Sequence, residues 1–143
     1  MKGIKMSDCK FYVNEKARTV ICVTPNVSSL VIDFIYDHFI WNDIDMWYGL
    51  SDIKEKLIMP RTFMGKAVCA PEDEWDEELG RMIAFARAKD KCYKSFFKRA
   101  NTYVQAVDRR LGDMIEMLND FGLKLSEKKD TLEAMIESKT QKE

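Results

Sequence analysis

The chain has 143 residues, with 23 basic and 24 acidic side chains that give a formal net charge of −1. This length favours a single domain, and the near-neutral charge argues against a protein that coats nucleic acid or membrane with its whole surface. Apolar residues make up 46% of the chain, and there are only six glycines and three prolines. That composition excludes a disordered or low-complexity protein.

No export or membrane signal is evident in the sequence. The longest mainly apolar stretch, around residues 30–35 and interrupted by Asp33, is far shorter than the roughly 20 residues that span a bilayer. The four cysteines have no CxxC spacing, so we expect reduced thiols in a cytoplasmic protein. The single histidine, His38, argues against a Ser-His-Asp triad and against most zinc sites.

The first half of the chain combines strand and helix patterns. Residues 9–24 are rich in β-branched and aromatic side chains around a turn-like segment at 14–17, which predicts a β-hairpin. Residues 28–39 carry apolar side chains at helical spacing, with Ser28 or Ser29 as the N-cap, and predict a short helix.

Two further strands are predicted before residue 70. They cover residues 57–59 and 62–69 and are separated by Pro60. A glycine inside the second strand, Gly65, indicates a bulge or a close approach of another backbone. The first half should therefore form a small antiparallel sheet with one helix packed on it.

The second half has a different pattern. Pro71 and the acidic residues at 72–78 are typical of a first helical turn, and no proline follows before Phe121. Gly122 is typical of a helix C-terminus. We predict a long helix over 71–122, followed by a tail or short helix that folds back over 123–143.

Together these elements predict an α+β subunit. Residues 1–70 would form the small antiparallel sheet with its short helix, and the long C-terminal helix would drive oligomerisation. We expect the three regions, 1–70, 71–122 and 123–143, to belong to one domain overall. The switch from period two to a heptad near Pro71 motivates this assignment.

The predicted long helix carries a regular apolar line, called here the heptad seam. Its members recur at alternating steps of four and three, a pattern that requires a partner helix. We expect a homodimer or higher oligomer held through residues 93–118. The seam comprises Leu79, Ile83, Ala86, Tyr93, Phe97, Ala100, Val104, Val107, Leu111, Met114, Leu118 and Phe121, with Asp90 as its one exception.

Beside the seam runs a second line, the aromatic–basic stripe, with the same spacing. It comprises Arg81, Phe85, Ala88, Cys92, Phe96, Arg99, Tyr103, Ala106 and Arg110. Residues 81–110 hold nine Lys and Arg against two acids, a local charge of +7. Guanidinium groups bind phosphates and aromatic rings stack on bases, so the stripe suits a compact anionic nucleotide. The alternative is a second packing surface whose Lys and Arg stems lie in solvent.

Other candidate sites have simpler explanations. Gly65-Lys66 lacks the P-loop frame. The aromatic segment around Trp41, Trp47 and Tyr48 could stack a base or anchor an interface. The acids at 72–78 are those expected at a helix start, and the cysteines lack a histidine that would activate them. We therefore predict no catalytic residues, no metal site, no cofactor and no enzymatic activity.

One stretch resembles a known protein family. Residues 63–76 (FMGKAVCAPEDEWD) lead into 79–89 (LGRMIAFARAK) and then 98–101 (KRAN). This succession of a "GKAxC" strand, a "PEDxxD" turn and a "GxxIAxxRA" helix is similar to small phage and prophage proteins of Firmicutes. Together with the N-terminal hairpin, it resembles the first-type Thoeris anti-defence protein family. The resemblance covers roughly residues 9–121.

The resemblance implies a function. Members of that family have a small N-terminal sheet and long helices through which they assemble. They sequester cyclic ADP-ribose isomers, and some also bind cyclic oligonucleotides, without cleaving them. By this resemblance the protein would act in the cytoplasm of an infected bacterial host cell. It would bind a cyclic nucleotide signal and copies of itself, with no DNA or membrane partner. The alternative is a protein-binding inhibitor, such as an anti-CRISPR-like factor, that acts on a host protein.

The candidate ligand-binding residues combine the stripe with positions near the matched motif. Two such stripes that meet across a dimer axis would supply paired arginines to the two phosphates of the ligand. If the stripe is not the site, the aromatic segment 41–48 is the fallback. The candidates are Arg61, Lys66, Phe85, Phe96, Arg99, Asn101, Tyr103, Arg109 and Arg110.

Overall fold

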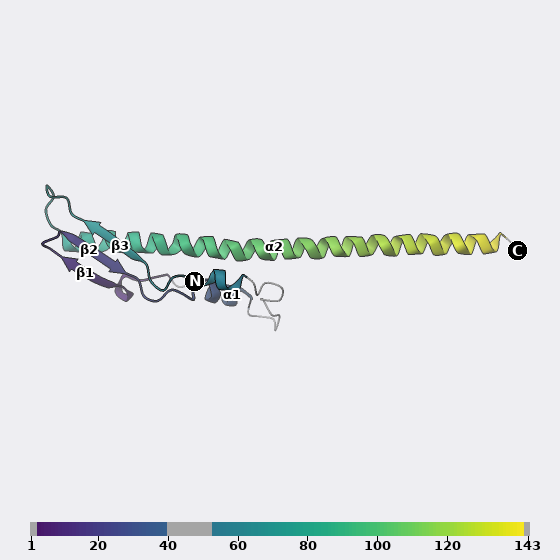
Figure 1. The fold of residues 1–143 in the computed structure, drawn as a ribbon, viewed down its shortest axis with the longest axis horizontal. Helices are drawn as coiled ribbons and strands as arrows, with labels where there is room; N and C mark the ends of the chain where they lie inside the picture. The colour runs from purple at the N-terminus through teal and green to yellow at the C-terminus, as the bar shows by residue number, and fades with distance from the viewer. Residues whose placement is uncertain (1–2, 40–52, 142–143) are drawn as a thin grey trace. The chain divides into compact units, whose positions relative to one another are not determined.

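The computed structural model of the chain describes residues 3–39 and 53–141. Its three strands, β1 (Lys10–Asn14), β2 (Thr19–Val23) and β3 (Met64–Val68), form one antiparallel sheet in the order β1-β2-β3. The described residues also form two α-helices. Helix α1 (Leu30–Phe39) lies between β2 and β3 in the chain, and α2 (Glu77–Thr140) follows β3 (Figure 1). The α+β architecture predicted from the sequence is confirmed. The aromatic segment 41–48 lies outside the described residues.

The chain divides into two compact units. Unit 1 is Met1–Val104 and unit 2 is Gln105–Glu143, so the division falls within α2. Unit 1 contains the sheet, α1 and the first turns of α2, and it holds every buried side chain among the described residues. Unit 2 is the remaining part of α2, and none of its described residues is buried.

The predicted hairpin is confirmed. Phe11 is paired with Cys22 and Asn14 with Thr19. In the turn, the side-chain oxygen of Asn14 accepts a hydrogen bond from the backbone N–H of Ala17 at 3.0 Å. Arg18 has a φ of 53°, in the left-handed region that an arginine rarely occupies. Turn and side-chain chemistry thus fix the register that the alternating pattern favours.

The close approach expected at Gly65 is also confirmed. A Cβ placed on Gly65 would lie 2.0 Å from the carbonyl oxygen of Ala84 and 2.4 Å from the amide nitrogen of Ala88. Both atoms belong to the backbone of α2, which therefore contacts the sheet with no side chain between them. Only glycine permits this distance.

The core of the sheet lies beneath this contact. Val20, Cys22 and Ala67 on the sheet and Ala84 and Ala88 on α2 form one buried cluster. Phe11, Val13 and Phe85 are among the partly buried residues that pack against it. The alternate side chains of the strands are half-buried or exposed, as in a sheet with one covered face.

The helix predicted over residues 28–39 is confirmed as α1. Its Val31 and Ile35 are fully buried, one turn apart. The hydroxyl of Ser29, which lies just before the helix, donates to the carboxylate of Asp33 in the first turn at 2.9 Å. The ring of Phe34 meets Phe96 of α2 edge-to-face, with 5.4 Å between centroids. This contact places α1 against α2 at a later turn than the sheet (Figure 1).

The strand predicted at residues 57–59 is wrong. Residues Lys54–Leu57 form a short 3-10 helix, η2, and Leu57 is completely buried. The N–H of Met59 donates to the carbonyl of Ser28, outside the sheet. The apolar run at 57–59 reflects burial rather than strand pairing, an ambiguity that short apolar runs always carry. The following strand begins at Met64 rather than at residue 62.

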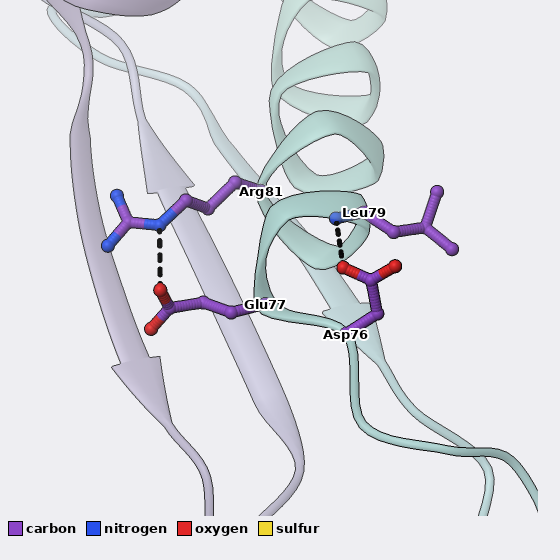
Figure 2. Close-up of polar contacts among 4 residues, drawn as sticks. All are labelled: Asp76, Glu77, Leu79 and Arg81. Atoms are coloured by element: carbon purple, nitrogen blue, oxygen red, sulfur yellow. Dashed lines mark hydrogen bonds and ion pairs between the residues drawn. The ribbon is translucent and has the colours of Figure 1, made fainter.

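The long helix begins later than predicted, at Glu77 instead of Pro71. Asp76 precedes it, and its carboxylate accepts a hydrogen bond from the N–H of Leu79 at 3.0 Å (Figure 2). Glu77 forms an ion pair with Arg81 one turn later, at 3.7 Å. The residues before Asp76 are not helical because Arg18 donates to the carbonyls of Ala70 and Asp73 and holds them in a turn.

The predicted end of the helix at Gly122 is also wrong. Helix α2 continues to Thr140, so residues 123–140 belong to it and form no separate helix that folds back. A glycine inside an exposed helix costs only about 1 kcal/mol relative to alanine. Apolar residues at Leu125 and Leu132 continue the helical period beyond Gly122. No helix of the described residues is both long enough and apolar enough to cross a membrane.

Candidate functional site

The aromatic–basic stripe lies mainly on the side of α2 that packs on the rest of unit 1. Ala88 and Cys92 are completely buried and Tyr103 is 3% exposed. Other members are half-buried, and Arg110 is exposed. Burial raises the pKa of Cys92 and of Tyr103 above their usual values. Over residues 81–103 the stripe is thus chiefly a packing surface. This is the alternative to nucleotide binding that the sequence analysis gave for the stripe.

The two candidate rings of the stripe already have partners. Phe85 packs against the core cluster, and the ammonium group of Lys89 lies 5.7 Å from the centre of its ring. Phe96 contacts Phe34 of α1. Both rings are half-buried. Stacking on a nucleobase would therefore involve only the ring surface that these contacts leave exposed.

The remaining candidates are spread over the molecule. Arg61 is exposed, and its carbonyl accepts a hydrogen bond from Val27 at 2.8 Å. Lys66 is exposed on β3, and Asn101 is exposed on α2. Arg109 and Arg110 are exposed in unit 2. The structure brings none of these five side chains into one described pocket with Arg99.

Arg99 instead lines a different depression, called here the basic hollow. It has a volume of about 520 Å³ and lies between η2 and α2. Its lining is four cations and two hydroxyl-bearing residues, and none of the described residues that line it is acidic. The lining residues are Lys56, Lys94, Ser95, Lys98, Arg99 and Thr102.

The guanidinium group of Arg99 is held in place by two hydrogen bonds. Its Nη1 donates to the carbonyl of Lys56 at 2.6 Å, and its Nε donates to the hydroxyl of Ser95 at 3.2 Å. These contacts tie η2 to α2. They also leave one guanidinium nitrogen without a described hydrogen bond, and fixed, partly desolvated cations of this kind suit phosphate oxygens.

Sequence reasoning missed most of the basic hollow. Lys94, Lys98 and Thr102 recur at four-residue intervals, so helical spacing could have grouped them with Arg99. Lys56 could not have been found in this way. It joins the hollow through η2, of which the sequence pattern assigned only the last residue, Leu57, to a strand.

Lys66 lies in a second depression, of about 490 Å³, lined by Lys66, Ile83, Ala86, Arg87, Asp90 and Lys91. Here two cations bind backbone. Arg87 donates to the carbonyl of Lys66 at 2.6 Å, and Lys91 donates to the carbonyl of Met64 at 2.9 Å. Because β3 is an edge strand, these bonds satisfy carbonyl groups that could otherwise pair with another chain.

The thiols of unit 1 show no catalytic arrangement. Burial raises the pKa of Cys22 to about 12, with the neighbouring Cys9 as a smaller cause. A raised pKa lowers the thiolate fraction and so disfavours nucleophilic attack. Cys69 accepts a contact from the guanidinium group of Arg18 at 3.0 Å, which also holds the adjacent turn. Among the described residues, no three His, Cys, Asp or Glu side chains are placed to hold a metal ion.

Comparison of the chain with protein-family models, with curated proteins and with solved structures found no match.

Proposed function

We propose that this protein binds and sequesters a phosphate-bearing nucleotide signal, such as a cyclic ADP-ribose isomer or a cyclic oligonucleotide, without cleaving it. The observation that carries the proposal is the basic hollow. It gathers four cations and two hydroxyls around about 520 Å³. The volume is within the range of small-molecule sites, and the charge is of the sign that a phosphate requires.

The hollow supplies two kinds of phosphate contact. Arg99, fixed by Lys56 and Ser95, would bind an oxygen directionally, while Lys98 would neutralise the charge as a mobile ammonium group. Lys94 would contribute charge by turning from its exposed ion pair with Asp90, which is 2.8 Å long. The hydroxyl of Thr102 donates to the carbonyl of Lys98 at 3.0 Å, so its oxygen can still accept a hydrogen bond from a ribose hydroxyl.

The same set of residues supports binding without cleavage. A hydroxyl attacks a phosphodiester only when a general base or a metal ion activates it. The described lining of the basic hollow has neither a carboxylate nor a histidine to activate the hydroxyls of Ser95 and Thr102. A ligand held there would leave intact, which is the behaviour expected of a protein that removes a signal by sequestration.

The test is retention and release of an intact ligand. The purified protein is incubated with cyclic ADP-ribose isomers and cyclic dinucleotides, separated from free ligand, and heated. We expect chromatography to recover one of these ligands unchanged. The Lys56→Ala, Lys98→Ala double variant should weaken binding at least about tenfold in calorimetry, since each lost phosphate contact is worth about 1 kcal/mol or more.

A matched control removes the same charge elsewhere. Lys10→Ala, Lys16→Ala takes two exposed lysines from the β1–β2 hairpin and should leave the affinity unchanged. Equal losses in both double variants would mean that net charge, and no defined site, attracts the ligand. Retention of no small molecule, together with a stable complex with a host protein, would instead support the protein-binding inhibitor.

A further inference from the structure

Most of the heptad seam of α2 is exposed, but Tyr93, Ala100 and Val107 are half-buried, and the hydroxyl of Tyr93 accepts a hydrogen bond from the N–H of Ile4 at 3.2 Å. In unit 1 its Phe97 is 71% exposed, and Leu79 and Val104 are each more than half exposed. In unit 2 the same spacing continues past Gly122 through Leu125 and Leu132. Seven seam side chains of unit 2 are each more than half exposed: Leu111, Met114, Leu118, Phe121, Leu125, Leu132 and Met135. Apolar surface of this extent marks an interface.

Three charged residues interrupt this extended seam. Asp90 is one, and continuation of the four-three steps beyond Phe121 adds Lys128 and Lys139. Asp90 is exposed, and its one described ion pair is with Lys94 of the next turn, at 2.8 Å. A charged residue in a helix–helix seam is unfavourable unless it meets an opposite charge, and it therefore selects register and orientation.

The two ends of α2 also differ in charge. Residues 81–98 hold six cations and one acid, a net charge of +5. Residues 120–137 hold three cations and five acids, a net charge of −2. A parallel pair of helices would place like charge beside like charge. An antiparallel pair would place the basic segment of each chain beside the acidic segment of the other, which is electrostatically favourable.

We infer that α2 pairs antiparallel with α2 of a second copy of this chain, about a two-fold axis at Arg109. In this register Asp90 of each chain lies opposite Lys128 of the other, so two exceptions to the apolar seam neutralise each other. The third, Lys139, lies opposite Leu79 at the outer end of the seam, where a lysine stem can cover an apolar side chain and its ammonium group can reach water.

The same register matches side-chain sizes. Small residues lie opposite large ones, as Ala86 opposite Leu132 and Ala100 opposite Leu118, and the two phenylalanines of the seam, Phe97 and Phe121, meet in one layer. The remaining layers pair Ile83 with Met135, Tyr93 with Leu125, Val104 with Met114 and Val107 with Leu111. No apolar position of the seam is left opposite a gap.

The flanking positions oppose this register weakly. The register places Arg87 near Lys129 of the other chain, and Asp108 and Arg110 each near their own copies beside the axis, all at exposed positions. Like charges at exposed positions destabilise by only a few tenths of a kcal/mol. The Arg87 contact and the pairing of Asp90 with Lys128 both occur twice per dimer, but the pairing lies within the seam, where less water screens the charges, so it outweighs this repulsion.

Charge reversal tests the register directly. The self-dissociation constants of D90K, K128D and the D90K/K128D double variant are measured by sedimentation equilibrium. Each single variant places like charges opposite each other twice, and we expect weakening of about tenfold or more. The double variant should return to within about threefold of the unmodified chain. Asp113→Lys, which reverses a charge off the seam, is the control and should change little.

In a parallel pair, each of these residues would face its own copy, so the single and double variants would all resemble the unmodified chain. That result would overturn the proposal. A chain that stays monomeric at every concentration up to about 100 μM would also overturn it, because that concentration is well above the dissociation constant of a stable dimer.

Cysteine cross-linking gives an independent readout. A mixture of Ala100→Cys and Leu118→Cys chains should form a covalent heterodimer under mild oxidation, beyond the background of the unmodified chain with its own cysteines. Neither variant alone should cross-link above that background. Self-linking of each variant alone would show a parallel pair. Absence of the heterodimer from the mixture would show that α2 does not pair with a second copy in this register, and would overturn the proposal.

Discussion

Two faces of the same helix behave differently between residues 79 and 104. One face carries Ala84, Ala88 and Cys92, all completely buried, and the two alanines pack against the sheet of the same chain. The other carries Leu79 and Phe97, which are more than half exposed. Tyr103 apart, which is 3% exposed, the buried side chains are small and the large ones of the other face are uncovered, which is the reverse of what hydrophobicity alone would suggest.

The difference shows what side-chain size contributes to helix packing. Alanine on α2 and Gly65 on β3 let two backbones touch, so the helix lies directly on the sheet. Large residues at four-three spacing cannot approach a flat sheet so closely, but they interdigitate with a second helix. The small face therefore serves the fold, and we assign the large face to assembly.

The largest effect is expected at the buried face. Gly65→Ala places a Cβ against backbone atoms of α2 that cannot move aside separately. We predict a loss of about 3 kcal/mol or more in the free energy of unfolding, measured by urea denaturation. Gly112→Ala is the control, because nothing lies within 4 Å of that position, and it should stabilise the helix by up to about 1 kcal/mol. Equal stability of Gly65→Ala and the unmodified chain would contradict the direct backbone contact.

The exposed face should respond in the opposite manner. Phe97→Ser removes a large side chain that is 71% exposed in one chain. We predict that the free energy of unfolding of unit 1 stays within about 0.5 kcal/mol of the unmodified value. Self-association should be about a hundredfold weaker, measured by size-exclusion chromatography with light scattering. Tyr12→Ser, at an exposed position on β1, should leave association unchanged. If the two variants associated equally well, Phe97 would have no place in the interface.

A smaller effect is expected where α2 starts. Asp76→Ala removes the carboxylate that accepts the N–H of Leu79 (Figure 2). The expected loss is about 1 kcal/mol in the free energy of unfolding. Asp73→Ala provides the comparison, since the carbonyl of Asp73 accepts from Arg18 and remains after the substitution. Urea denaturation should give a lower free energy of unfolding for Asp76→Ala than for Asp73→Ala. An Asp76→Ala variant as stable as the unmodified chain would argue against this cap.

The smallest effect appears only in alkaline solution. Burial, assisted by Cys9, raises the pKa of Cys22 from 9.0 to about 12. A raised pKa means that the folded state favours the neutral thiol, so this stabilisation is complete below pH 9 and is lost between pH 9 and about 12. Cys22→Ala should therefore reduce the fall in the urea midpoint over that interval. Some of the fall will remain, because burial also raises the pKa values of Cys92 and Tyr103. An unaltered slope would mean that Cys22 does not titrate during unfolding.

Local patterns predicted the parts of the fold that depend on near neighbours. The hairpin, α1 and the close approach at Gly65 follow from strand alternation, helical spacing and one glycine. The start of α2 does not, because Arg18, far away in the sequence, holds the acidic turn out of the helix. The 3-10 helix η2 was missed for a similar reason. Leu57 is apolar because the tertiary structure buries it, and an apolar residue followed by two others resembles a short strand.

The candidate site was predicted less well. Arg99 was found by its place in the stripe, and the structure sets it beside Lys56 and Ser95. The stripe as a whole was a poor guide because the same spacing serves packing, and Tyr103 is buried. Periodicity identifies a helix face, but which face the rest of the chain covers is decided by long-range contacts.

The division of α2 into a packing face and an assembly face is tested most directly by the mass of the unmodified chain in solution. Sedimentation equilibrium over a range of micromolar concentrations should give twice the chain mass of 16.7 kDa, with dissociation only on dilution. A constant mass of 16.7 kDa at every concentration would contradict the account, because the large apolar face of α2 would then have no second copy to cover it.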